Sequence, residues 1–107
     1  MSDRLAYTAG IIDGEGHFYC PNTRNGRGEA HIYPRIVVVN TDSRLTEWLK
    51  AQWGGSVTSR ESKGYKRLYR WQLQGRQAVI LASAILPYLI VKREQIYRFS
   101  PYGLRSG

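Results

Sequence analysis

The stretch from Tyr7 to Phe18, YTAGIIDGEGHF, constrains the fold more than any other part of the chain. Its first half combines small and apolar residues, as in a helix that packs closely against a neighbour. The residues after Gly14 alternate polar and apolar side chains, which is typical of a strand. Glu15 therefore stands where a helix gives way to a strand. Because Asp-Gly between β-forming residues is a strong hairpin signal, an ordinary hairpin turn is the alternative interpretation.

The rest of the chain predicts one α+β domain spanning residues 1–107, since this length suits a single hydrophobic core. Helices are expected at about 3–12, from a start at Thr41, Asp42 and Ser43 to an end at Gly54 and Gly55, at 76–86 and at about 91–99. Strands are expected at about 15–20, 30–40, 56–62 and 66–74. The order αββαββα, followed by a last short helix, predicts an antiparallel four-stranded, saddle-shaped sheet with the helices on one face. The first helix is apolar on more than one side, so we expect it to have two packing partners.

The charge balance favours a polyanionic partner. Lys and Arg number 16 against 8 Asp and Glu, a formal charge of +8, and the basic residues are spread along the chain. A basic folded surface is typical of nucleic-acid binding, although a merely soluble basic protein or a ribosomal-type RNA binder has the same balance. A lone Cys20 excludes a disulfide framework or a thiolate zinc site within one chain. We expect a soluble intracellular protein with no targeting segment and no membrane partner, because no apolar stretch approaches the roughly 20 residues of a membrane span.

Two segments carry a family resemblance. TAGIIDGEG, from Thr8 to Gly16, resembles the motif of the LAGLIDADG homing endonucleases, and LPYLIVKREQ, from Leu86 to Gln95, is similar to the family segment that carries an active-site lysine. The predicted element order and basic sheet also resemble that family. Thr8 replaces the first leucine of the motif, a change expected to be peripheral, and Glu15 replaces its last aspartate. A single copy of the motif implies a homodimer.

The resemblance implies a metal-dependent site. Glu15, helped by the backbone carbonyl of Gly14, is expected to hold Mg²⁺, with Mn²⁺ or Ca²⁺ as other occupants, because hydrolysis of a phosphodiester calls for a hard cation with oxygen ligands. Lys92 is expected to polarise the water network or stabilise the pentavalent phosphate, Asn40 to order water and Arg44 to hold phosphate. The alternatives are a solvated helical lysine, a strand-end asparagine and an arginine on a helix surface.

The same resemblance divides the remaining candidates between two surfaces. Ala6, Ala9 and Gly10 are expected at the dimer interface, together with Asp13, which we expect to bind local backbone groups. The sheet is expected to read DNA in the major groove, while Arg24, Arg27 and Lys63 in loops hold phosphates. Counting by twos from the motif gives the base-facing set His17, Tyr19, His31, Tyr33, Arg35, Val37, Thr58, Arg60, Lys66, Arg70 and Gln72. A register error of one residue would exchange this set with the core.

Together these features predict a homodimeric homing endonuclease, of a kind associated with intron or intein mobility, that makes a staggered cut in a long pseudo-palindromic double-stranded DNA target. The alternative on the same fold is a non-cleaving nucleic-acid binder, such as an intron RNA maturase or a regulator, for which RNA is the partner. A ribosomal-type protein, the third interpretation, predicts a monomer.

Overall fold

The computed structural model describes residues 3–19, 22–24, 30–32, 34–61, 63–64 and 66–96, and for 22–24 and 30–32 it describes the backbone alone. Two predicted DNA contacts, Arg27 and Tyr33, lie outside the described residues. The side chains of Arg24 and His31 lie outside them as well.

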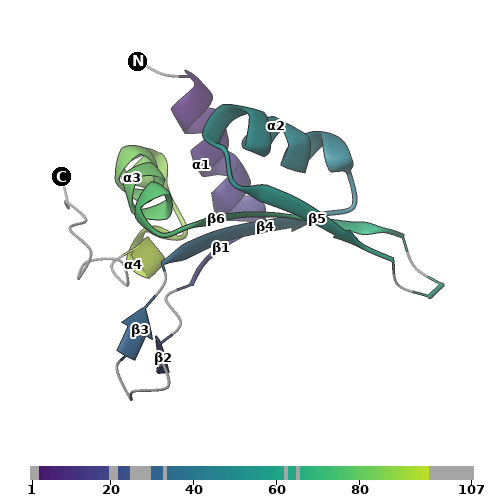
Figure 1. The fold of residues 1–107 in the computed structure, drawn as a ribbon. Helices are drawn as coiled ribbons and strands as arrows, with labels where there is room; N and C mark the ends of the chain where they lie inside the picture. Colours follow the sequence, from purple (N-terminus) through teal and green to yellow (C-terminus); the bar gives the residue numbers. More distant parts are fainter. Residues whose placement is uncertain are drawn as a thin grey trace.

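Four antiparallel strands form one sheet in the order β1-β4-β6-β5, and two short strands form a second sheet. The strands are β1 (Gly16–Tyr19), β2 (Asn22–Arg24), β3 (Ala30–Ile32), β4 (Arg35–Asn40), β5 (Ser56–Arg60) and β6 (Leu68–Gln74). The helices are α1 (Asp3–Glu15), α2 (Ser43–Trp53), α3 (Arg76–Ile85), the 3₁₀ turn η1 (Leu86–Tyr88) and α4 (Arg93–Ile96). Figure 1 shows α1, α2 and α3 on one face of a curved sheet. The predicted α+β class and αββαββα order are confirmed.

The opening stretch is a helix followed directly by a strand, so the hairpin interpretation is wrong. Helix α1 continues three residues past its predicted end and includes Glu15 as its last residue. The chain turns at Gly16, where a Cβ atom would lie 2.8 Å from Cα of Ile12 and 2.9 Å from its Cγ2. Such contacts are too close for any side chain. Gly16 therefore lets β1 leave the helix at once, with Glu15 at the junction.

The second predicted strand is also corrected. Residues 30–40 form two strands in different sheets, β3 and β4, because Pro34 interrupts them. Proline has no N–H to donate to a strand ladder and restricts the residue before it. Its carbonyl accepts a 2.8 Å hydrogen bond from the backbone N–H of Gly75, just before α3. In Figure 1 the β2–β3 ribbon extends away from the main sheet.

The core lies between the sheet and the helices and follows the predicted alternation. Phe18, Ile36, Val38, Trp71 and Leu73 are fully buried or nearly so. The indole N–H of Trp71 donates a 2.8 Å hydrogen bond to the carbonyl of Gly54, so the largest buried side chain also has its polar atom satisfied.

Helices α1 and α2 are joined by a buried polar contact. Thr8 is 0% exposed, and its Oγ1 donates to the carbonyl of Arg4 at 2.7 Å and accepts from the indole N–H of Trp53 at 3.0 Å. The guanidinium of Arg4 lies 4.4 Å from the centre of the Trp53 ring. The substitution at Thr8 is therefore not peripheral, because this hydroxyl holds the two helices together.

Candidate functional site

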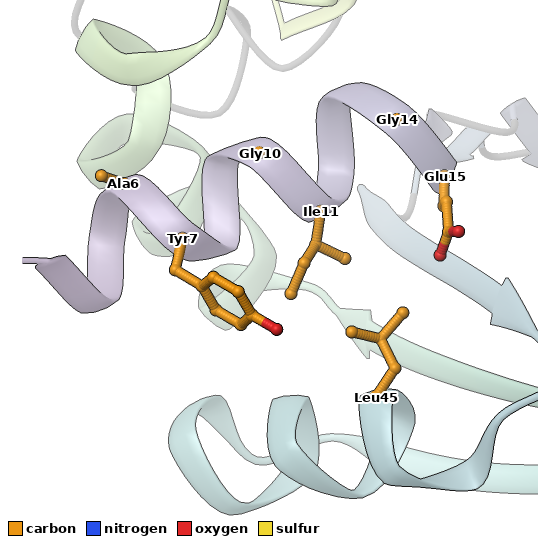
Figure 2. Close-up of a pocket in the computed structure, with 7 residues that line it drawn as sticks. All are labelled: Ala6, Tyr7, Gly10, Ile11, Gly14, Glu15 and Leu45. Carbon is orange, nitrogen blue, oxygen red and sulfur yellow. The ribbon is translucent and has the colours of Figure 1, made fainter.

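Glu15 is an exposed carboxylate held by one neighbour. Nδ2 of Asn40 donates a 2.6 Å hydrogen bond to Oε2 of Glu15, and Oδ1 of Asn40 accepts a 2.8 Å bond from the backbone N–H of Asp42. The second bond fixes which end of the amide faces Glu15, since an amide oxygen accepts and its nitrogen donates. Figure 2 shows Glu15 at the end of α1, just beyond Gly14. The carboxylate thus lies where α1, β4 and the start of α2 meet.

Lys92 lies at the same end of α1. Its Nζ donates a 2.9 Å hydrogen bond to the carbonyl of Ile12, in the last turn of the helix. Carbonyls in the last turn lack a partner within the helix, and a cation there is stabilised by the helix dipole. The structure therefore brings the predicted lysine, Glu15 and Asn40 together around the last turn of α1.

Asp13 anchors the segment that carries this lysine. Its Oδ2 accepts from the backbone N–H of Ile90 at 2.7 Å, and its Oδ1 accepts from those of Val91 at 3.1 Å and Lys92 at 2.9 Å. The expectation that Asp13 binds backbone groups holds, but the groups lie far along the chain and not at its own helix end. Both carboxylate oxygens of Asp13 accept hydrogen bonds from its own chain. These contacts give no support to the predicted place of Asp13 in a dimer interface.

Arg44 is paired with an acid that the sequence interpretation treated only as a helix start. Its Nη2 lies 2.6 Å from Oδ2 of Asp42, and its Nε donates to Oδ1 at 3.0 Å. Asp42 also caps α2 by accepting the backbone N–H of Arg44 at 2.9 Å. The hydrogen bonds from Arg44 lower the pKa of Asp42 from 3.8 to about 2. An acid at the N-cap two residues before an arginine is the signal that could have predicted this pair.

The donor chemistry at Glu15 suits a hard cation, but one chain supplies few ligands. The Glu15 carboxylate and the carbonyl of Gly14 are oxygen donors, the type that Mg²⁺ prefers. The bond from Asn40 leaves the carboxylate with further lone pairs. Within the described residues, however, no group of three or more His, Cys, Asp or Glu side chains could hold a metal ion. Mg²⁺ takes about six oxygen ligands, so a complete site needs donors from outside the described chain.

The face of the sheet opposite the helices is basic. The described strands β1, β4, β5 and β6 contain no Asp or Glu. In β1, exposed His17 and Tyr19 alternate with buried Gly16 and Phe18, as predicted, and their rings lie 5.9 Å apart. Because β1 pairs with β4, the open face continues onto that strand.

The open face of β4 is less accessible than predicted. The strand register sets Tyr19 opposite Arg35, and His17 opposite Val37. Val37 pairs on its other side with Gln72 and therefore lies on the predicted face. It is only 3% exposed, so a DNA base could not contact its side chain.

The second hairpin extends this open face as the alternation predicted. Thr58 lies opposite Arg70, and Arg60 lies opposite Leu68. Nη2 of Arg70 donates a 3.2 Å hydrogen bond to Oε1 of Gln72 on the same strand. The predicted Lys63 and Lys66 are exposed and lie between β5 and β6, outside both strands.

Helix α1 carries an exposed stripe of small residues. Ala6, Gly10 and Gly14 follow one another at intervals of four, and a Cβ added at either glycine would meet no atom within 4 Å. The stripe borders an open groove between α1 and α2 that is lined by Ala6, Tyr7, Gly10, Ile11, Gly14, Glu15 and Leu45 (Figure 2). Ala9 is 0% exposed, so its predicted place at a dimer interface is wrong. It packs inside its own subunit.

Comparison with known proteins gives a fold match without a sequence match. No protein-family model matches the chain, and no curated protein matches it. In the described residues, no helix is long and apolar enough to cross a membrane.

Three solved structures illustrate the match. The homing endonuclease I-CvuI in complex with its target has a TM-score of 0.73 at 18% identity, covering 87% of this chain and 60% of that one. The archaeal intron-encoded homing endonuclease I-Vdi141I complexed with DNA has a TM-score of 0.73 at 18% identity, and the match covers 91% of this chain and 65% of that one. The LAGLIDADG homing endonuclease I-GzeII in complex with its DNA target has a TM-score of 0.54 at 18% identity, and the match covers 96% of this chain and 30% of that one. The chain spans less than two thirds of each of these proteins. Its fold is that of the LAGLIDADG homing endonucleases.

Proposed function

We propose that this protein is a site-specific DNA endonuclease of the homing type, which acts as a homodimer and hydrolyses phosphodiester bonds with a divalent cation. The observation that carries this proposal is the carboxylate of Glu15, held by Asn40 at 2.6 Å beside a basic sheet face. The structural neighbours support it, since I-CvuI and I-Vdi141I are homing endonucleases in complex with DNA.

Duplex DNA lies against the open sheet face in this proposal. A chain with a net charge of +8 attracts phosphates, and strands free of Asp and Glu add no local repulsion. Exposed Arg60 and Arg70, with partly buried Gln72, have the donors that distinguish guanine and adenine in the major groove. Arg24, Arg27 and Lys63 hold the phosphate backbone, and His17, Tyr19 and Arg35 extend the reading surface.

The residues at the end of α1 divide the chemistry between them. Glu15, with the carbonyl of Gly14, holds the cation, which when bound neutralises developing charge and lowers the pKa of water; Mg²⁺ is the cation we favour. I-CvuI complexes with DNA were obtained in the presence of Ca and of Mg, which supports a divalent ion. Asn40 keeps the Glu15 carboxylate in place by donating to Oε2.

Two cationic side chains exchange a partner when DNA binds. The Lys92 ammonium leaves the carbonyl of Ile12 and moves to a phosphate oxygen, where its charge stabilises the pentavalent phosphate. The Arg44 guanidinium exchanges the carboxylate of Asp42 for a phosphate, which offers the same two-oxygen geometry. Each exchange replaces one oxygen acceptor by another, so neither cation is left without a partner.

The homodimer completes the site. Small residues let two helix backbones approach closely, and the exposed stripe Ala6, Gly10 and Gly14 offers such a surface. Two copies packed through this stripe, with the ends of α1 side by side, bring two Glu15 carboxylates to the centre of the DNA. Two-fold symmetry then gives one cut on each strand, which produces staggered ends in a pseudo-palindromic target.

The test is a cleavage selection with the purified full chain. A duplex library with a randomised insert is enriched for binding without Mg²⁺, then Mg²⁺ is added and the released ends are sequenced. We expect defined ends with a constant stagger inside a two-fold-related consensus. An enriched pool that stays uncut would contradict the proposal and support a non-cleaving binder, and stronger enrichment from an RNA library would identify it as an RNA binder.

A further inference from the structure

An apolar patch lies among the polar residues of the open sheet face. Val39 on β4 and Leu68 at the start of β6 are each 38% exposed. The strand register sets Val39 opposite Arg70 and Leu68 opposite Arg60. A shallow depression is lined by both apolar residues, both arginines, Thr58 and Ser59. Two apolar side chains therefore sit between two cations on the surface proposed to meet DNA.

The size of this patch limits what it can bind. A stable protein interface buries about 800 Å² on each partner, far more than two partly exposed side chains offer. The flanking arginines and the absence of acids on the described strands favour an anionic partner with a small apolar group. In the major groove of DNA that group is the 5-methyl of thymine.

The geometry points to a thymine-reading subsite made by Val39 and Leu68, an inference that rests on the proposed function and adds a base preference to it. The two side chains contact the 5-methyl group of one thymine in each half-site, and Arg70 contacts the neighbouring base. Arg70 is oriented for this, because its Nη2 is already bonded to Oε1 of Gln72.

The position of the patch predicts where the thymine lies. Val39 directly precedes Asn40, which bonds to Glu15, whereas Arg35 and Tyr19 lie at the opposite end of their strands. The thymine should therefore fall in the inner part of each half-site, nearer to the cleavage position than the bases that face Arg35 and Tyr19.

The experiment removes the methyl group from the DNA and the patch from the protein. Binding selection is run on one randomised duplex library made with thymidine and on a second made with deoxyuridine. We expect the wild type to prefer thymine at one inner position of each half-site and to lose that preference with deoxyuridine. The loss should be about fourfold in affinity for each half-site, the factor for burying one methyl-sized group. At that position 5-methylcytosine should bind better than cytosine by a similar factor.

Protein variants give the second arm. Val39→Ser combined with Leu68→Gln should abolish the thymine preference and leave the other positions unchanged, while Ile80→Ser, which removes a 60% exposed apolar side chain on α3, should change nothing. The deoxyuridine comparison uses the wild type, so it stands even if the double variant folds poorly. If uracil is still preferred at that position in the deoxyuridine library, or if no inner position prefers thymine, this inference is overturned. The protein would still bind DNA, so the proposed function would stand. A wild type that enriches no duplex overturns the proposed function as well.

Discussion

The side-chain amide of Asn40 joins Glu15 to the start of α2. Its Nδ2 donates to Oε2 of Glu15 at 2.6 Å, while its Oδ1 accepts the backbone N–H of Asp42 at 2.8 Å. One side chain thus fixes the carboxylate proposed to hold the cation and the helix that carries Arg44. Changing this residue should affect catalysis more than DNA binding, since it lies beside the open face and not on it.

Asn40→Asp keeps an oxygen acceptor for Asp42 but replaces the donor to Glu15 with a second carboxylate. We expect single-turnover cleavage to fall about 10- to 100-fold, the usual effect of losing a residue that orients a metal ligand, with DNA affinity changed much less. Asn40→Ala should lose cleavage too and also lower the free energy of unfolding by about 1 kcal/mol, because the bond to Asp42 disappears. Equal losses of affinity and rate would contradict a positioning role.

Thr8→Val should destabilise the protein by about 1–3 kcal/mol, because the new side chain has the same shape but gives the indole N–H of Trp53 no acceptor. Replacing both partners, in Thr8→Val with Trp53→Phe, should recover part of this loss. Urea unfolding of the two single variants and the double variant measures the coupling. Strictly additive losses would mean that the 3.0 Å bond does not join α1 to α2.

Gly10→Leu should leave the subunit folded but block the dimer. A Cβ atom added at this position would meet nothing within 4 Å, so the bulk of the leucine would project into the proposed helix interface. Sedimentation should show a dimer for the wild type in the presence of target DNA and a monomer for Gly10→Leu. Ala51→Leu, at a position on α2 that is also exposed, is the matched control and should dimerise normally. A dimeric Gly10→Leu would place the interface elsewhere.

The Asp42–Arg44 pair has a defined pH range. The pKa of Asp42 is lowered by folding from 3.8 to about 2, so its contribution to stability is present above pH about 4 and is lost as the pH falls through about 2. NMR titration should find the low value in the wild type and a return towards 3.8 in Arg44→Gln. No change in Arg44→Gln would mean that another group lowers this pKa. At neutral pH Asp42 is ionised and the pair is intact, and under the proposed function a DNA phosphate then competes for Arg44.

Much of this architecture followed from periodicity and composition. The alternation in β1 and β6 correctly separated core from open face, because side chains point to opposite sides of a strand at every second residue. The motif also correctly placed Glu15 next to a helix end, and the register now sets the predicted His17 and Arg70 on the same face.

The remaining errors came from contacts between distant segments. Ala9 looked like an interface residue because small residues suit both a tight core and a helix dimer, and only the packing of the whole chain decides between them. Asp13 binds backbone groups of the segment before α4, and Thr8 binds Trp53 on α2. The missed Asp42–Arg44 pair is the exception, because an acid at the N-cap two residues before an arginine is a local signal. No local pattern encodes the long-range pairings of Asp13 and Thr8.

The central claim is that the carboxylate of Glu15 supports phosphodiester cleavage. The direct measurement is Mg²⁺-dependent cleavage of the selected target at saturating protein, made with Glu15→Gln and with a control, Glu47→Gln. The control removes a different exposed carboxylate, which lies on α2. We predict that Glu15→Gln binds the target as tightly as the wild type but yields no double-strand product, while Glu47→Gln cleaves normally. Cleavage by Glu15→Gln at the wild-type rate would contradict this account.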